Sequence, residues 1–165
     1  MEKILQPNSR QCFVCGLSNP FGLRLRFYNQ SLGEVAADCI IPEQYQGFPG
    51  IVHGGVVAAM LDEAAGRSLM ISDTAGAQNP RFMFTARLDI RYRNNVPVGK
   101  SLRLVGKAGK SKARTAQAEA FIFDPSGTLL AQAEALLMDV PEALLPAYDL
   151  ENLGWKLYPE ERLEQ

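Results

Sequence analysis

The spacing of hydrophobic and polar residues predicts two strands and a helix in the first half of the chain. Residues 23–28 and 34–41 are rich in apolar and β-branched or aromatic positions, which predicts two strands joined by a turn at 29–33. Residues 42–50 contain two Pro and two Gly and are expected to form a loop. Residues 54–71 lack Pro and are rich in Ala, Leu and Met, which predicts one long helix.

After a second loop at 72–81 the hydrophobic period becomes two, which is typical of strands. Residues 82–93 are expected to form a long strand, and its predicted apolar face consists of Phe82, Phe84, Ala86, Leu88, Ile90 and Tyr92. Further strands are expected at 101–109, 113–123 and 128–140. Alanine recurs at alternate positions of the last two strands, so another element can approach that face closely.

The order of elements is strand, strand, helix and four strands, which argues against an alternating βαβ sheet. We therefore expect an α+β fold, in which one central helix lies in a curved antiparallel sheet of about six strands. Residues 1–21 form an irregular lead-in, 22–140 a single domain and 141–165 a tail. The tail residues Tyr148, Trp155 and Tyr158 either pack back on the sheet or a partner, or belong to a partly ordered segment.

Composition narrows the possible partners. The 165 residues suit one domain, and a net charge of −1 gives no electrostatic reason to expect nucleic acid or an anionic membrane as the partner. The N-terminus lacks the apolar core of a signal peptide, and no apolar run approaches the roughly 18 residues of a membrane span. An odd count of three cysteines fits a reducing compartment, so a cytoplasmic location is expected.

A carboxylate pair interrupts the apolar helix. At 100° per residue, one small apolar side of the helix, expected to face the sheet, has Asp62 at its centre. The members of this side are Gly55, Ala58, Ala59, Asp62, Ala65, Gly66 and Leu69. Glu63 points elsewhere and is in register for an ordinary surface ion pair with Arg67. A buried carboxylate is costly, so Asp62 is either a base or nucleophile, or a carboxylate satisfied by a strand or a dimer contact.

The sequence His53-Gly54-Gly55 precedes this helix. Glycines at a helix start leave backbone N–H groups bare at the positive end of the dipole, where an oxyanion can bind; alternatively, they form a tight turn. His53 either takes part in the chemistry or caps the helix. Asp62 lies about 10–12 Å further along the helix. The site therefore combines two subunits, or the substrate lies along the helix.

The stretch "FPGIVHGGVVAAMLDEAAG" (48–66) resembles the hotdog-fold acyl-CoA thioesterases, in the subgroup like the phenylacetate-pathway thioesterase. The lead-in "CFVCGLSNPFGL" is also similar to bacterial relatives. The resemblance implies that Asp62, nine residues after His53, is the general base or nucleophile. It further implies that the N–H of Gly55, helped by Gly54, polarises the thioester carbonyl, that His53 orients the thioester, and that the site lies between two subunits.

Two further positions follow from the resemblance. The Ser or Thr that relatives carry on the strand after the helix falls on Thr85, and their Asn or Gln before the His falls nearest to Gln46. Simple alternation, however, makes Thr85 point with Met83 and Arg87, away from the apolar face. Only a bulge near Phe84 would reverse this direction.

The remaining candidates are cysteines and basic residues. Cys12 and Cys15 form a C-x-x-C, but zinc usually needs four ligands, so we expect a structural lead-in and no metal within one chain; a site shared across a dimer is conceivable. Basic residues on strand ends and one turn either bind CoA phosphates or form a solvated rim. They are Arg91, Arg93, Lys107, Lys110, Lys112 and Arg114.

The sequence thus favours an acyl-CoA thioesterase that needs no cofactor, since CoA is part of the substrate, and that works as a homo-oligomer, a dimer or a dimer of dimers. One alternative is a hotdog dehydratase or hydratase acting on 3-hydroxyacyl or enoyl thioesters. Another is a non-catalytic acyl-CoA binding protein. The double glycine followed by Asp62 favours hydrolysis over dehydration.

Overall fold

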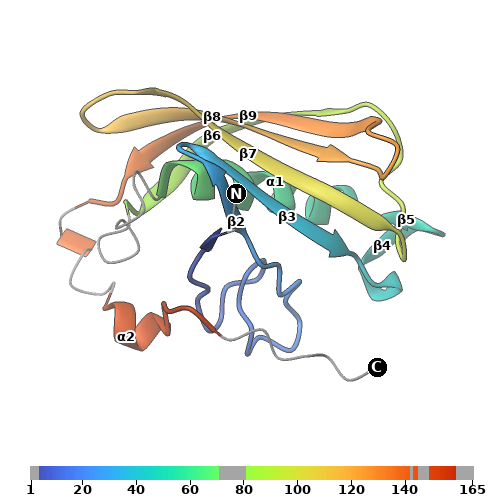
Figure 1. Ribbon diagram of the computed structural model, residues 1–165, viewed down its shortest axis with the longest axis horizontal. Coiled ribbons are helices and arrows are strands. Elements are labelled where there is room, and N and C mark those ends of the chain that lie inside the picture. The colour runs from blue at the N-terminus through green and yellow to red at the C-terminus, as the bar shows by residue number, and fades with distance from the viewer. Residues whose placement is uncertain (1–3, 71–80, 142, 145–148, 159–165) are drawn as a thin grey trace.

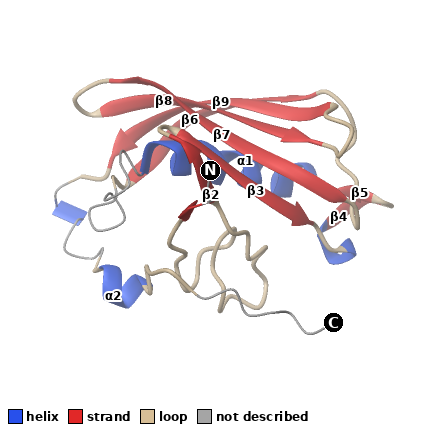
Figure 2. Cartoon of the chain, in the orientation of Figure 1, coloured by secondary structure: helices blue, strands red, loops and turns tan. Residues whose placement is uncertain are grey.

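The computed structural model describes residues 4–70, 81–141, 143–144 and 149–158 and has one antiparallel sheet curved around a long helix (Figures 1 and 2). The helix is α1 (Gly54–Met70). The strands are β1 (Ile4–Leu5), β2 (Tyr28–Ser31), β3 (Glu34–Ile40), β4 (Gln46–Phe48), β5 (Ile51–Val52), β6 (Met83–Tyr92), β7 (Ser101–Ser111), β8 (Thr115–Phe123) and β9 (Leu129–Asp139). The predicted α+β class is confirmed.

The main sheet has seven strands instead of about six, in the order β1-β2-β3-β7-β8-β9-β6. The additional strand, β1, comes from the lead-in and pairs with β2. The loop predicted at 42–50 instead holds a short 3-10 helix (Glu43–Tyr45) and β4, which forms a separate hairpin with β5. The prediction of a strand at 23–28 is wrong for most of that range, because strand pairing begins only at Tyr28.

The helix fits closely against the middle of the sheet. The alanine columns of β8 and β9 are buried beneath it, as the small-residue pattern predicted. Gly106 of β7 marks the closest approach, since a Cβ there would overlap the carbonyl oxygen of Ala64. Small side chains therefore set the distance between the helix and the sheet.

The buried face of α1 is not the face that the 100° arithmetic selected. The buried residues are Val57, Met60, Leu61, Ala64, Ala65, Arg67 and Ser68. Asp62, Gly55 and Gly66 are less buried and lie on the flank of this face. The larger apolar side chains decide the orientation because they remove more apolar area from water than glycine and alanine do.

Strand β6 contains a bulge, which corrects its predicted apolar face. Thr85 pairs with Leu137 and Arg87 with Leu136, so Ala86 has no partner on β9. The alternation changes phase at this point: Phe84 is 44% exposed, whereas Leu88 and Ile90 pack against the core. β6 also forms one end of the seven-stranded sheet, as expected for an edge strand.

The lead-in and the described part of the tail pack on each other and on the domain. The side-chain amide of Asn8, which is buried, donates to the carbonyl oxygens of Cys15 (2.6 Å) and Leu25 (2.9 Å). In the tail, α2 (Leu150–Leu153) is followed by Trp155, whose ring meets Phe82 edge-on at 5.5 Å. Tyr148 and most of loop 72–81 lie outside the described residues.

Candidate functional site

The bulge in β6 brings Thr85 to Asp62. The hydroxyl of Thr85 donates to Asp62 Oδ1 at 2.6 Å, so the direction expected for Thr85 from simple alternation is wrong. Burial raises the pKa of the Asp62 carboxyl, the hydrogen bond from Thr85 opposes that rise, and the charge of Glu63 adds to it. The helix thus presents a half-buried carboxylate with a raised pKa, a property that favours work as a base.

His53 caps the start of α1. Its Nδ1 accepts the N–H of Gly55 at 2.9 Å, and its carbonyl oxygen accepts the N–H groups of Val56 and Val57. The expectation that the N–H of Gly55 is bare is therefore wrong. The N–H of Gly54 makes no hydrogen bond to the described residues, so it is the donor that remains at the helix start.

Tyr92 is a candidate site residue that sequence reasoning missed. Its hydroxyl donates to the carbonyl oxygen of Gly54 at 2.8 Å and fixes the first residue of the helix against the end of β6. The bulge at Ala86 lies between Thr85 and Tyr92, so the two side chains point to the same side of the strand, and both contact α1. The sequence could have indicated Tyr92, because it belongs to the predicted apolar face of the strand at 82–93.

Gln46 stabilises the loop before the helix. Its side-chain oxygen accepts the N–H of Gly50 at 3.1 Å, and its strand partner is Val52, next to His53. The neighbouring Gly47 leaves room for the imidazole, because a Cβ there would lie 2.9 Å from His53 Cδ2. Gln46 is thus close to the helix start, but no hydrogen bond among the described residues joins this group to the Asp62–Thr85 pair.

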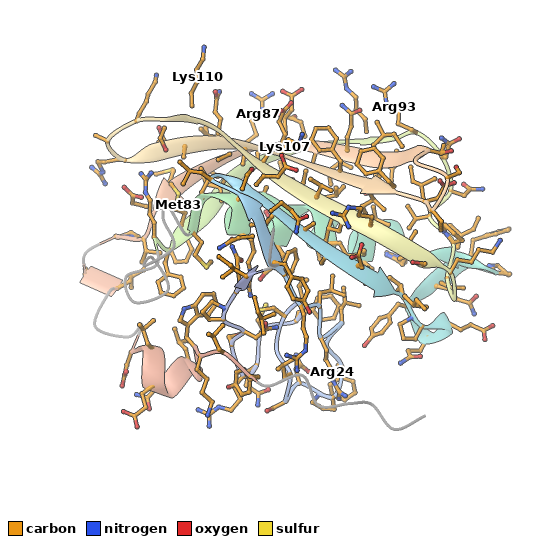
Figure 3. All side chains as sticks on the ribbon, in the orientation of Figure 1. Arg24, Met83, Arg87, Arg93, Lys107 and Lys110 are labelled. Atoms are coloured by element: carbon orange, nitrogen blue, oxygen red, sulfur yellow. The ribbon has the colours of Figure 1, made fainter. Side chains whose placement is uncertain are left out.

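The basic candidates lie on the other side of the sheet. Figure 3 shows two of them, Lys110 and Arg93, extending from the face that is turned away from α1. Arg91 lies at a shallow depression on β6 and β9, and Lys110 and Lys112 border another on β7 and β8. Within the described part of one chain they do not converge with Asp62.

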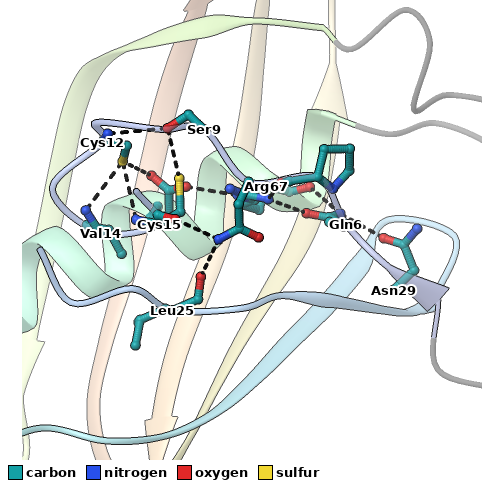
Figure 4. Close-up of polar contacts among 11 residues, drawn as sticks. Gln6, Ser9, Cys12, Val14, Cys15, Leu25, Asn29 and Arg67 are labelled. Atoms are coloured by element: carbon teal, nitrogen blue, oxygen red, sulfur yellow. Dashed lines mark hydrogen bonds and ion pairs between the residues drawn. The ribbon is translucent and has the colours of Figure 1, made fainter. Parts of the chain in front are cut away.

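Glu63 belongs to a partly buried polar cluster, so the prediction of an ordinary surface ion pair is wrong. Figure 4 labels Cys12, Cys15 and Arg67 of this cluster. Glu63 Oε1 accepts from Arg67 Nε at 2.8 Å as predicted, but the Arg67 side chain is fully buried. Arg67 also donates to the carbonyl oxygen of Pro7, and its guanidinium lies 5.0 Å from the ring centres of Phe27 and Trp155. The lead-in and the tail therefore enclose this cation.

Cys12 and Cys15 complete the cluster. The Cys12 thiol donates to Glu63 Oε2 at 3.6 Å. A hydrogen bond from Cys12 lowers the pKa of Cys15 to about 7 against the effect of burial, while the pKa of Cys12 is raised by that bond, by burial and by Glu63. Cys39, on β3, lies apart, and burial raises its pKa to about 12.

Comparison with known proteins identifies the family. The model of the thioesterase superfamily matches residues 49–131, half of the chain, which include α1 and β6. The chain therefore belongs to the thioesterase superfamily. A search of curated proteins finds no match.

Solved structures agree on the fold. A thioesterase superfamily protein is 29% identical with a TM-score of 0.69; the match covers 79% of this chain, and this chain spans 61% of that relative. The E. coli PaaI protein from the phenylacetic acid degradation operon is 12% identical with a TM-score of 0.62. That match covers 72% of this chain and 81% of the PaaI protein. A Streptococcus mutans protein, bound to acetyl CoA, is 15% identical with a TM-score of 0.61. That match covers 70% of this chain and 88% of the Streptococcus mutans protein. The fold is therefore the hotdog fold, as the sequence predicted. No helix in the described residues is long and apolar enough to cross a membrane.

Proposed function

We propose that the protein hydrolyses acyl-CoA thioesters to a free acid and CoA. The observation that carries this proposal is the Asp62 carboxylate, half-buried beside Thr85 on the helix that opens with Gly54 and Gly55. Membership of the thioesterase superfamily supports hydrolysis as the reaction. The acetyl CoA bound by the Streptococcus mutans protein of the same fold supports CoA as the thiol.

In this proposal Asp62 acts on the thioester carbon in one of two ways. It removes a proton from an attacking water, or it attacks directly and forms an anhydride that water then cleaves. The raised pKa makes Asp62 a stronger base than an ordinary carboxylate. Thr85 holds the carboxylate through its Oδ1, which leaves Oδ2 to face the water or the substrate.

The helix start would hold the carbonyl oxygen of the substrate. The N–H of Gly54 has no partner among the described residues, and the helix dipole adds positive potential there. His53 and Tyr92 support this donor, since one caps the helix and the other bonds the carbonyl oxygen of Gly54. Because Asp62 lies about two turns further along, we propose that the helix start of one subunit works with Asp62 of another.

A panel of aryl-, short-, medium- and long-chain acyl-CoAs tests the proposal. We expect release of free CoA thiol and of the matching acid, with the rate depending on the acyl group. A parallel assay of enoyl-CoA and 3-hydroxyacyl-CoA follows the enoyl absorbance. Interconversion of these two without thiol release would favour the dehydratase, and binding without turnover would favour an acyl-CoA binding protein.

A further inference from the structure

Three potential metal ligands meet where the lead-in crosses the helix. One donor atom from each of Cys12, Cys15 and Glu63 lies within 4.8 Å of the other two (Figure 4). The two sulfurs come from the loop before β2, and the carboxylate comes from the middle of α1. The sequence offered only two of these ligands together, because Glu63 is 48 residues beyond Cys15 and joins them through the fold.

Two backbone N–H groups of the loop around the cysteines converge on one sulfur. The backbone N–H groups of Val14 and Cys15 both point at Cys12 Sγ, at 3.3 and 3.4 Å. Such bonds are stronger to a thiolate than to a thiol, because the acceptor is charged. Gly16 closes the turn with its N–H on the carbonyl oxygen of Cys12, and a Cβ there would lie 2.6 Å from the backbone nitrogen of Cys12.

Glu63 has one oxygen available for a ligand. Its Oε1 is held by Arg67, while its Oε2 lies 3.6 Å from Cys12 Sγ. In a tetrahedral zinc site, the usual zinc–sulfur and zinc–oxygen bond lengths separate those two atoms by about 3.6 Å. The ion pair with Arg67 would orient the carboxylate from outside the first coordination shell, as partners of metal ligands commonly do.

We propose that Cys12, Cys15 and Glu63 bind one zinc ion that fastens the lead-in to α1, with a water molecule as the fourth ligand. On binding, the zinc–sulfur bonds replace the two S–H bonds, and both protons leave to solvent. Two thiolates and a carboxylate then carry three negative charges, which zinc and the buried Arg67 together neutralise. Cys12 and Glu63 are only partly buried, so the ion has a path to the site.

Metal titration of the reduced, chelator-treated full-length protein tests this site. We expect about one zinc per chain, and we expect cobalt to give the near-ultraviolet absorption of thiolate-to-metal charge transfer. Cys12→Ser and Cys15→Ser should each weaken zinc binding by about tenfold or more. Cys39→Ser, which changes a cysteine on β3 outside the cluster, should bind zinc as the wild type does.

Two readouts on the unaltered protein keep the test independent of how the variants fold. Zinc should raise the thermal unfolding midpoint of the wild type. It should also protect Cys12 and Cys15 from an alkylating reagent, as mapped by mass spectrometry, with Cys39 as the internal comparison. The proposal is overturned if reduced protein binds no zinc or cobalt, if Cys39→Ser loses binding as much as the other two variants, or if the pair only forms a disulfide in air.

Discussion

At the scale of single residues, the half-buried carboxylate of Asp62 carries a cost to the fold. Because folding raises its pKa, the folded chain holds this proton more tightly than the unfolded chain. The group therefore favours folding below its ordinary pKa of about 4 and loses that contribution as the pH rises through the raised pKa. An amide at this position would not titrate and could still accept from Thr85.

We therefore expect Asp62→Asn to be more thermally stable than the wild type near neutral pH. The difference should shrink as the pH falls through the raised pKa of Asp62 and should vanish below the ordinary value of about 4. Thermal unfolding followed by circular dichroism across this range measures it. Asp89→Asn, which removes an exposed carboxylate paired with Arg87 on β6, is the matched control and should show little change at any pH. If the unfolding midpoint of the wild type rose relative to that of Asp62→Asn as the pH increased, the ionised carboxylate would stabilise the fold, contrary to this expectation.

The N–H of Gly54 can be removed without adding a bulky group. Gly54→Pro deletes the N–H that has no partner among the described residues, and proline is favourable in the first helical position. Gly54→Ala keeps the N–H, and its Cβ would make an ordinary 3.6 Å contact with the hydroxyl of Tyr92. Loss of this donor should lower kcat by about 100-fold or more in the proline variant.

The alanine variant should keep most of its activity, and both variants should keep the helical circular dichroism of the wild type. The thiol-release assay makes the comparison. Equal rates for Gly54→Pro and Gly54→Ala would mean that the oxyanion binds elsewhere.

At the scale of elements, alanine substitutions of two glycines between α1 and the sheet should have opposite effects on stability. Gly106→Ala should destabilise the protein strongly, because its methyl group would overlap the carbonyl oxygen of Ala64 and push α1 away from β7. Gly66→Ala places a methyl 3.7 Å from Leu137, which is ordinary contact, and improves helix propensity by about 1 kcal/mol.

Denaturant unfolding measures both changes. Gly66→Ala should raise the free energy of unfolding by up to about 1 kcal/mol, whereas Gly106→Ala should lower it by about 1–3 kcal/mol or prevent folding. A Gly106→Ala protein as stable as the wild type would show that the close contact between α1 and β7 does not exist in solution.

The elements also show which features the sequence could predict. Helix α1 and strands β8 and β9 follow regular periods over many residues, so their type and their buried alanines were predictable. The bulge at Ala86 leaves the composition of the strand unchanged, and its only effect is a change of phase that reverses Thr85. The places of Asp62 and His53 on and before the helix were therefore predictable from the sequence, whereas the contacts of Tyr92 and Glu63 depend on packing between distant segments.

At the scale of the whole molecule, the expectation of an oligomer rests on an edge strand and on the distance along α1. β6 is the last strand of the sheet among the described residues, and a long edge strand favours pairing with another strand. In one chain, no hydrogen bond among the described residues joins the helix start to the Asp62–Thr85 pair. A second copy that brings its own helix start to Asp62 would complete the site.

Mixing two inactive variants tests whether the site is shared. If each site uses Gly54 from one subunit and Asp62 from another, a mixed dimer of Gly54→Pro and Asp62→Asn has one intact site. Random exchange of subunits should then restore about a quarter of the wild-type activity. Each variant alone, unfolded and refolded in the same way, is the control. No recovery after proven exchange, or an active monomer in light scattering, would mean that one chain carries the whole site.

The most direct test of the central claim is the rate of acyl-CoA hydrolysis by the wild type, Asp62→Asn and Asp89→Asn, measured by thiol release with the best acyl group of the panel. If Asp62 is the base or nucleophile, its replacement lowers kcat by about two to four orders of magnitude, while folding and oligomeric state persist. Asp89→Asn, on the outer face of the neighbouring strand, should stay close to the wild type. A folded Asp62→Asn protein with near wild-type turnover would contradict the assignment of the chemistry to this helix.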